Sequence, residues 1–139
     1  MEITANALQT VAIGSNVLFT ETAVKGNCSI IHREGSGLTT LRGITRQCRA
    51  RFKVTFGANV ALPADATVVP ILLALAVNGE PVATTTMIST PAAVEEFNNV
   101  SSSVFFDVPA CCCYQISVRN IGTTEVDVQN ANLIVERVA

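Results

Sequence analysis

The chain ends in the segment EVDVQNANLIVERVA, Glu125–Ala139, which contains neither proline nor glycine. In its first part, Val126 and Val128 alternate with two acidic residues, a period of two that is typical of a strand with one buried face. A terminal segment of this kind is usually held within a sheet. We therefore predict a closing strand, Glu125–Val138, in the middle of a sheet.

The alternation stops at Leu133-Ile134-Val135, where three apolar residues follow one another. An unbroken apolar run indicates a strand that is covered on both faces. A chain of 139 residues fits one domain, and its core is limited when a second face must also be covered. We expect another copy of the chain to cover that face, in line with a composition that is 49% apolar and only 14% charged.

Period-2 segments separated by turn residues recur along the whole chain, and β-branched residues are abundant. The expected strands are Ile3–Leu8, Asn16–Thr20, Ser29–Arg33, Leu38–Arg42, Arg49–Phe56, Val69–Val77, Val82–Ile88, Ser103–Val108, Tyr114–Asn120 and Glu125–Val138. Short strands at near-regular spacing indicate an all-β sandwich or barrel. Residues 1–139 then form a single domain, in which residues 1–10 are either the first strand or an attachment arm.

The clearest turn is Asn78-Gly79, because both residue types accept the positive φ angles of a tight hairpin. It predicts two neighbouring antiparallel strands. Gly57-Ala58-Asn59 is one of several further expected breaks. Pro91–Phe97 is either a short helical turn or the lead-in to the next strand.

Basic residues are concentrated in one part of a chain whose net charge is -2. Five of the nine lie close together: Arg42, Arg46, Arg49, Arg51 and Lys53. The last three alternate with apolar residues, so we place them on the outward face of a strand. No Gly-rich or aromatic stacking motif accompanies them, and we do not expect a nucleic-acid partner.

Membrane insertion and classical export are not expected either. The longest apolar run, Val68–Val77, has ten residues and contains Pro70, which is about half of what a bilayer requires. The first residues, Met1–Asn6, lack the basic and apolar stretches of a secretion signal.

Cysteines are the most conspicuous candidates for chemistry: Cys28, Cys48 and the triplet Cys111-Cys112-Cys113. Their spacing does not match the paired ligands of a zinc site, so no metal is expected. Two interpretations remain open for these five residues. They form disulfide bridges, with one cysteine left over, or they serve as buried thiols in the core.

No catalytic set emerges from the remaining residues. A Cys–His or Ser–His pair would depend on His32, the single histidine, which lies at the end of an expected strand. Glu95 and Glu96 are adjacent and point to different sides, and Gly35-Ser36-Gly37 is too short for a phosphate-binding loop. We expect neither an enzyme nor a cofactor.

With these residues identified, the chain resembles the trimeric jelly rolls related to tumour necrosis factor and to complement globular heads. The bacterial versions, including exosporium head domains and virion proteins of tailed phages, are similar in their second half. The features that carry the likeness are the Val77-Asn78-Gly79 hairpin, the Thr/Ser-rich Thr84–Thr90, Phe105-Phe106 and the closing Leu133–Ala139. The resemblance implies an antiparallel two-sheet jelly roll and a homotrimer with the last strand beside the threefold axis.

By the same resemblance, Leu133, Val135 and Phe105 belong to the trimer interface. No Gly-X-Y collagen repeat precedes the domain, so the trimer itself or Met1–Thr10 is expected to reach the partner. The expected function is that of a non-enzymatic virion structural protein, a capsid decoration or head-fibre protein of a tailed bacteriophage. Its partner would be the major capsid protein or another virion protein.

Such a protein is made in the host cytoplasm and ends on the surface of the phage head. The alternative is a receptor- or glycan-binding head on a phage tail or on a bacterial or spore surface. Sugar sites usually require aromatic stacking, yet the chain has no Trp and a single Tyr, Tyr114.

Overall fold

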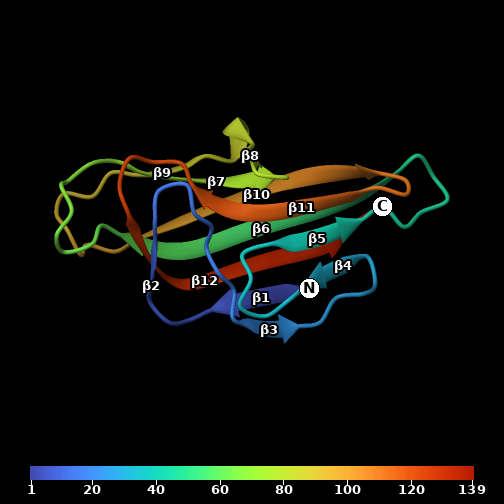
Figure 1. Ribbon diagram of the computed structural model, residues 1–139, viewed down its shortest axis with the longest axis horizontal. Helices are drawn as coiled ribbons and strands as arrows, with labels where there is room; N and C mark the ends of the chain where they lie inside the picture. The colour runs from blue at the N-terminus through green and yellow to red at the C-terminus, as the bar shows by residue number, and fades with distance from the viewer.

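Two antiparallel β-sheets pack face to face in the computed structural model, which describes residues 1–139 (Figure 1). The chain forms twelve strands and one short 3₁₀ turn, η1 (Ala83–Thr85). It has no helix that is long and apolar enough to cross a membrane. The expected all-β, two-sheet sandwich is confirmed.

The first sheet, called here the β12 sheet, contains both ends of the chain. Its strands follow the order β10, β6, β12, β1 and β3, and β2 also pairs with β12. Their bounds are β10 (Asn98–Pro109), β6 (Arg49–Ala61), β12 (Val126–Arg137), β1 (Glu2–Ala5), β3 (Glu21–Val24) and β2 (Gln9–Val11). Because β1 and β2 both pair with β12, most of the segment Met1–Thr10 is part of this sheet.

The second sheet, called here the β11 sheet, follows the order β4, β5, β11, β7 and β8, and β9 pairs with β7. Its bounds are β4 (Ile30–His32), β5 (Thr39–Arg42), β11 (Cys113–Asn120), β7 (Ile71–Val77), β8 (Glu80–Pro81) and β9 (Met87–Ser89). The β7–β8 hairpin turns at Asn78 (φ 50°) and Gly79 (φ 87°), as predicted.

The inner faces of the two sheets share one core of 28 buried apolar residues. On β6, Phe52, Val54 and Phe56 are fully buried, and the residues between them point outward. Phe56 meets Phe19 edge to face, with ring centroids 6.3 Å apart. Period-2 patterning therefore decides which face of this strand enters the core.

The closing strand β12 is central, as predicted, with β6 on one side and β1 on the other. Its alternation changes phase at a bulge: the pairing with β6 shifts between Gln129 and Asn132, and Asn130 has a φ of 55°. Val126 and Val128 point inward before the bulge, and Leu133 and Val135 point inward after it. One extra residue thus keeps both halves of the strand facing the core.

Two expected strands and one expected break are wrong. Asn16–Thr20 is not a strand, because it crosses between the sheets: the Val17 amide donates to Val118 O on β11, and the Thr20 amide donates to Thr4 O on β1. Val82–Ile88 is interrupted by η1, where the buried Thr85 hydroxyl bonds to Leu75 and Val82 of the main chain.

The expected break at Gly57 instead lies inside β6, which continues to Ala61. Pro91–Phe97 contains no helical turn and leads into β10, so the second of the two interpretations holds.

The bulge gives a direct test. Asn130→Val should lower the free energy of unfolding by about 1–2 kcal/mol, because a β-branched residue is strained at positive φ. Asn130→Gly should change it by less than about 0.5 kcal/mol, since glycine accepts this backbone geometry. Chemical denaturation of both variants measures the difference, and equal stability of the two would argue against a bulge in solution.

Candidate self-association surface

The outward side of β10, β6 and β12 forms a broad surface, called here the outer face. Alternate residues of each strand point onto it, because successive side chains leave a strand on opposite sides. They are Asn99, Ser101, Ser103, Phe105 and Asp107 of β10, Arg49, Arg51, Lys53, Thr55, Gly57 and Asn59 of β6, and Asp127, Gln129, Asn132, Ile134 and Glu136 of β12.

Two large apolar side chains stand on the outer face. Phe105 is 59% exposed and Ile134 is 37% exposed. Phe105 lies opposite Lys53, and Ile134 lies opposite Thr55, so the two apolar residues occupy neighbouring rows of the ladder. Phe105 is on the edge strand and Ile134 is two strands further in. Phenylalanine in the middle of a strand is usually buried, and its exposure marks this surface as a candidate for a partner.

The assignment of Leu133 and Val135 to an interface between copies is wrong. Their exposed fractions are 1% and 0%, because the bulge at Asn130 turns both side chains into the protomer's own core. Ile134, which lies between them, is the residue of the apolar run that faces outward. The sequence signal for this shift is an asparagine inside a strand pattern, since asparagine tolerates positive φ.

The part of the outer face around Gly57 and Asn59 is uncharged, whereas Glu2 lies opposite Ile134 on β1 and Lys53 lies opposite Phe105. Gly57 lies opposite Asn132, and a Cβ atom on Gly57 would approach Asn132 Oδ1 to 3.1 Å. Asn59 donates to Asn130 Oδ1 at 3.2 Å and accepts from Asn99 Nδ2 at 3.2 Å. These amides bond to each other across three strands, so little unpaired charge would have to be desolvated if this part of the face were covered.

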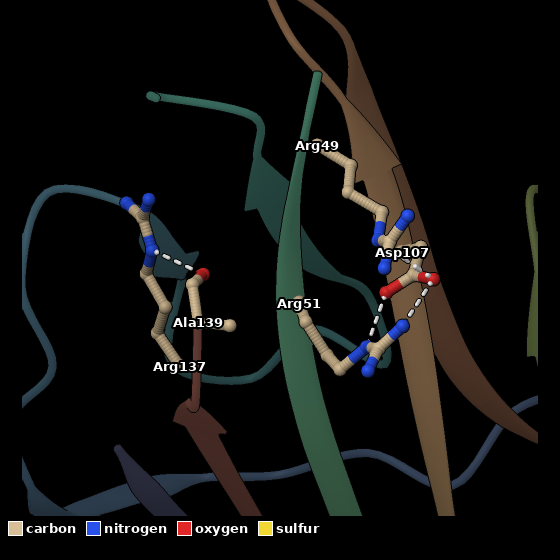
Figure 2. Close-up of polar contacts among 5 residues, drawn as sticks. All are labelled: Arg49, Arg51, Asp107, Arg137 and Ala139. Atoms are coloured by element: carbon tan, nitrogen blue, oxygen red, sulfur yellow. Dashed lines mark hydrogen bonds and ion pairs between the residues drawn. The ribbon is translucent and has the colours of Figure 1, made fainter. Parts of the chain in front are cut away.

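Charges gather at one end of the outer face, near the turn from β10 to β11. Arg51 makes two hydrogen bonds to Asp107, Nε to Oδ1 at 2.7 Å and Nη2 to Oδ2 at 3.0 Å (Figure 2). Arg49 Nε lies 3.2 Å from the same carboxylate. The predicted outward position of Arg49, Arg51 and Lys53 agrees with the alternating burial of β6.

The five cysteines are neither buried nor bridged. Cys28, Cys48, Cys111, Cys112 and Cys113 are all free and exposed. The interpretation of buried core thiols is therefore wrong, and the structure contains no disulfide bridge. Cys111 and Cys112 belong to the turn between β10 and β11, where Cys111 has a φ of 65°.

The remaining candidates for chemistry are not assembled into a site. His32 Nε2 donates one hydrogen bond to Ser36 O at 3.0 Å, and the ring packs edge-on against Phe19. Its Nδ1 atom is buried without a partner. No group of three or more His, Cys, Asp or Glu side chains has the geometry of a metal site.

Asp107 gives a pH-dependent prediction. The hydrogen bond from Arg51 lowers the pKa of Asp107, and the positive charges of Arg51 and Arg49 add to this effect. Because the folded pKa lies below the unfolded one, the ion pair stabilises the fold above the unfolded pKa. That contribution is lost as the pH falls through the folded pKa. The gain in stability is small, since the groups are exposed.

An NMR titration of the Asp107 carboxyl measures this effect. In Arg51→Gln the Asp107 pKa should rise toward its ordinary value. An unchanged titration would mean that the ion pair is not formed in solution.

Comparison with known proteins supports the architecture. No protein-family model and no curated protein matches the sequence. Among solved structures, the globular domain of zebrafish complement 1qA protein is similar, with a TM-score of 0.63 and 11% sequence identity. The match covers 96% of this chain and 93% of that chain. The chain therefore has the jelly-roll fold of complement and tumour-necrosis-factor heads.

Proposed function

We propose that this chain is a non-enzymatic structural protein that forms a homotrimer through its outer face. The trimer serves as a capsid decoration or head-fibre protein on a tailed bacteriophage, bound to the major capsid protein or another virion protein. The observation that carries the assembly is the exposure of Phe105 and Ile134 on one sheet face.

Burial of these two residues provides a driving force. Fully burying a large apolar side chain contributes about 1.5–3 kcal/mol. Phe105 and Ile134 are 59% and 37% exposed, so burying what remains of both favours association by about 1.5–3 kcal/mol for each protomer, before the cost of association is subtracted. The hydrogen-bonded amides and Gly57 add uncharged area, while Glu2 opposite Ile134 and Lys53 opposite Phe105 must keep water or find a partner charge in the assembly.

A threefold assembly requires two different patches on each protomer, because its contacts are heterologous. The outer face offers them: Phe105 lies on the edge strand β10, and Ile134 lies on the central strand β12. In the proposed trimer, the β10 edge of one protomer packs over the β12 surface of the next. Ile134 thus takes the place that the sequence assigned to Leu133 and Val135.

The virion role is supported by the resemblance to phage and exosporium heads and by the shared jelly-roll fold. Two features that carry this resemblance have a place in the fold: the Val77-Asn78-Gly79 hairpin connects β7 with β8, and Phe105 lies on the edge strand β10, next to β6. In this role the protein is made in the host cytoplasm and reaches the particle during assembly.

Charge placed on the outer face should prevent trimer formation. Phe105→Asp and Ile134→Asp are each expected to shift the protein from trimer to monomer, because the new carboxylate would be desolvated in the interface. Ile88→Asp is the matched control: Ile88 is 65% exposed but lies on β9 of the β11 sheet, and its variant should stay trimeric.

Light scattering after gel filtration measures the mass, and thermal unfolding verifies that each variant is folded. A monomeric wild type at micromolar concentration would refute the trimer. Trimeric forms of both outer-face variants would place the interface elsewhere.

The location on the particle is a separate prediction. Antibodies against this chain should label the heads of purified phage particles under the electron microscope. Labelling at the tail tip would instead support the receptor- or glycan-binding alternative, and absence of labelling on intact particles would contradict both roles.

A further inference from the structure

All five cysteines gather at one end of the sandwich, called here the thiol end. They come from three separate segments: the β3–β4 loop, the β5–β6 loop, and the β10–β11 turn with the start of β11. These segments lie at the right-hand end of Figure 1. Free cysteine is among the most buried residue types, so five exposed thiols at one end require an explanation.

Hydrogen bonds to main-chain oxygens hold these segments together. The Gly43 amide donates to Cys112 O at 2.8 Å, and the Cys111 amide donates to Gly43 O at 3.0 Å. The Ala110 amide donates to Cys48 O at 3.0 Å, and Arg42 Nη1 donates to Cys28 O at 3.2 Å. A Cβ atom on Gly43 would lie 2.1 Å from Pro109 O, so only glycine allows this close approach.

The thiols lie beside arginines. One hollow of about 120 Å³ is lined by Arg42, Gly43, Ile44 and the cysteine triplet, and is called here the thiol hollow. A second hollow of about 270 Å³ is lined by Gln47, Cys48, Arg49, Arg51 and Ala139. Asp107 faces Arg49 and Arg51, and Ala139 O accepts from Arg137 Nε at 3.3 Å (Figure 2). Arg42 and Arg46 have no acidic partner.

The opposite end of the sandwich is acidic. Asp65 and Glu125 line a common hollow there, and the Glu95 amide donates to Leu62 O close to it. The loops that carry these residues lie at the left of Figure 1. A chain with net charge -2 thus presents a locally basic surface at its thiol end, which attracts anions.

We propose that the thiol hollow is a modification site for anionic low-molecular-weight disulfides. A deprotonated thiol of the triplet attacks one sulfur of the disulfide R–S–S–R. The protein then carries the mixed disulfide Cys–S–S–R, and the thiolate RS⁻ leaves and takes up a proton. Arg42, which lines this hollow, holds a carboxylate of the incoming disulfide. This inference does not rest on the proposed trimer.

Five thiols cannot all pair within one chain, because their number is odd. If a second thiol of the same chain displaces the bound RS group, one intrachain bridge forms and other thiols remain. At least one RS group should therefore stay attached to each chain under excess disulfide.

The full-length chain is treated with three disulfides of different charge. They are oxidised glutathione (anionic), 2-hydroxyethyl disulfide (neutral) and cystamine (cationic). Mass spectrometry follows the adduct, and peptide mapping identifies the modified residue. We expect the anionic disulfide to react fastest at low ionic strength, on a residue of the triplet. The rates should converge in salt, which screens exposed charges.

Variants that remove single positive charges test whether the arginines attract the anionic disulfide. Arg42→Gln should slow the reaction with oxidised glutathione by about fivefold, and leave the neutral disulfide unaffected. Arg46 is exposed, forms no ion pair and does not line the thiol hollow, so Arg46→Gln should change the rate less than Arg42→Gln. Arg33→Gln is the control, since Arg33 is exposed and lies beyond the far end of β4 from Cys28.

Three results would overturn the proposal. The first is equal reaction of the three disulfides at low ionic strength. The second is an adduct confined to Cys28 or Cys48 that persists when the triplet is replaced by serine. The third is the formation only of bridges, within a chain or between copies, without a stable RS adduct.

Discussion

The central position of β12 is the constraint on which the structure depends. Its main chain bonds to β6 on one side and to β1 and β2 on the other, so it connects the edge strand β10 to the first residues of the chain. The Met1 amino group donates to Val135 O at 2.7 Å, which places the N-terminal residue along the same strand. Removing β12 would split the sheet into the pairs β10–β6 and β1–β3, would leave β2 without a partner, and would open the core.

The same strand also organises the thiol end. Arg137, its last residue, donates to Ile44 O at 2.6 Å and to Ser29 Oγ at 3.3 Å. One guanidinium group thus connects the closing strand to the β5–β6 loop and to the segment after Cys28. The cysteines are held on segments that β12 and the Gly43 contacts fix in place.

The bulge at Asn130 decides which side chains of the apolar run in β12 enter the core and which face outward. It turns Leu133 and Val135 inward, so the apolar run contributes to stability within the protomer. Only Ile134 is left to join Phe105 on the outer face. The two proposed activities use different places: assembly would use the outer face around Phe105 and Ile134, and thiol chemistry would use the β5–β6 loop and the β10–β11 turn.

Much of the fold follows from local sequence. Alternating residues placed Arg49, Arg51 and Lys53 on the outward face of a strand, and Asn78-Gly79 located a hairpin, because both signals depend on near neighbours and intrinsic backbone preferences. Only the tertiary structure decided the phase of β12 after Asn130, because a bulge is defined by pairing with a partner strand. It alone also brought together Cys28, Cys48 and the triplet, since residues far apart in sequence meet only when separate loops end at the same edge of the sandwich.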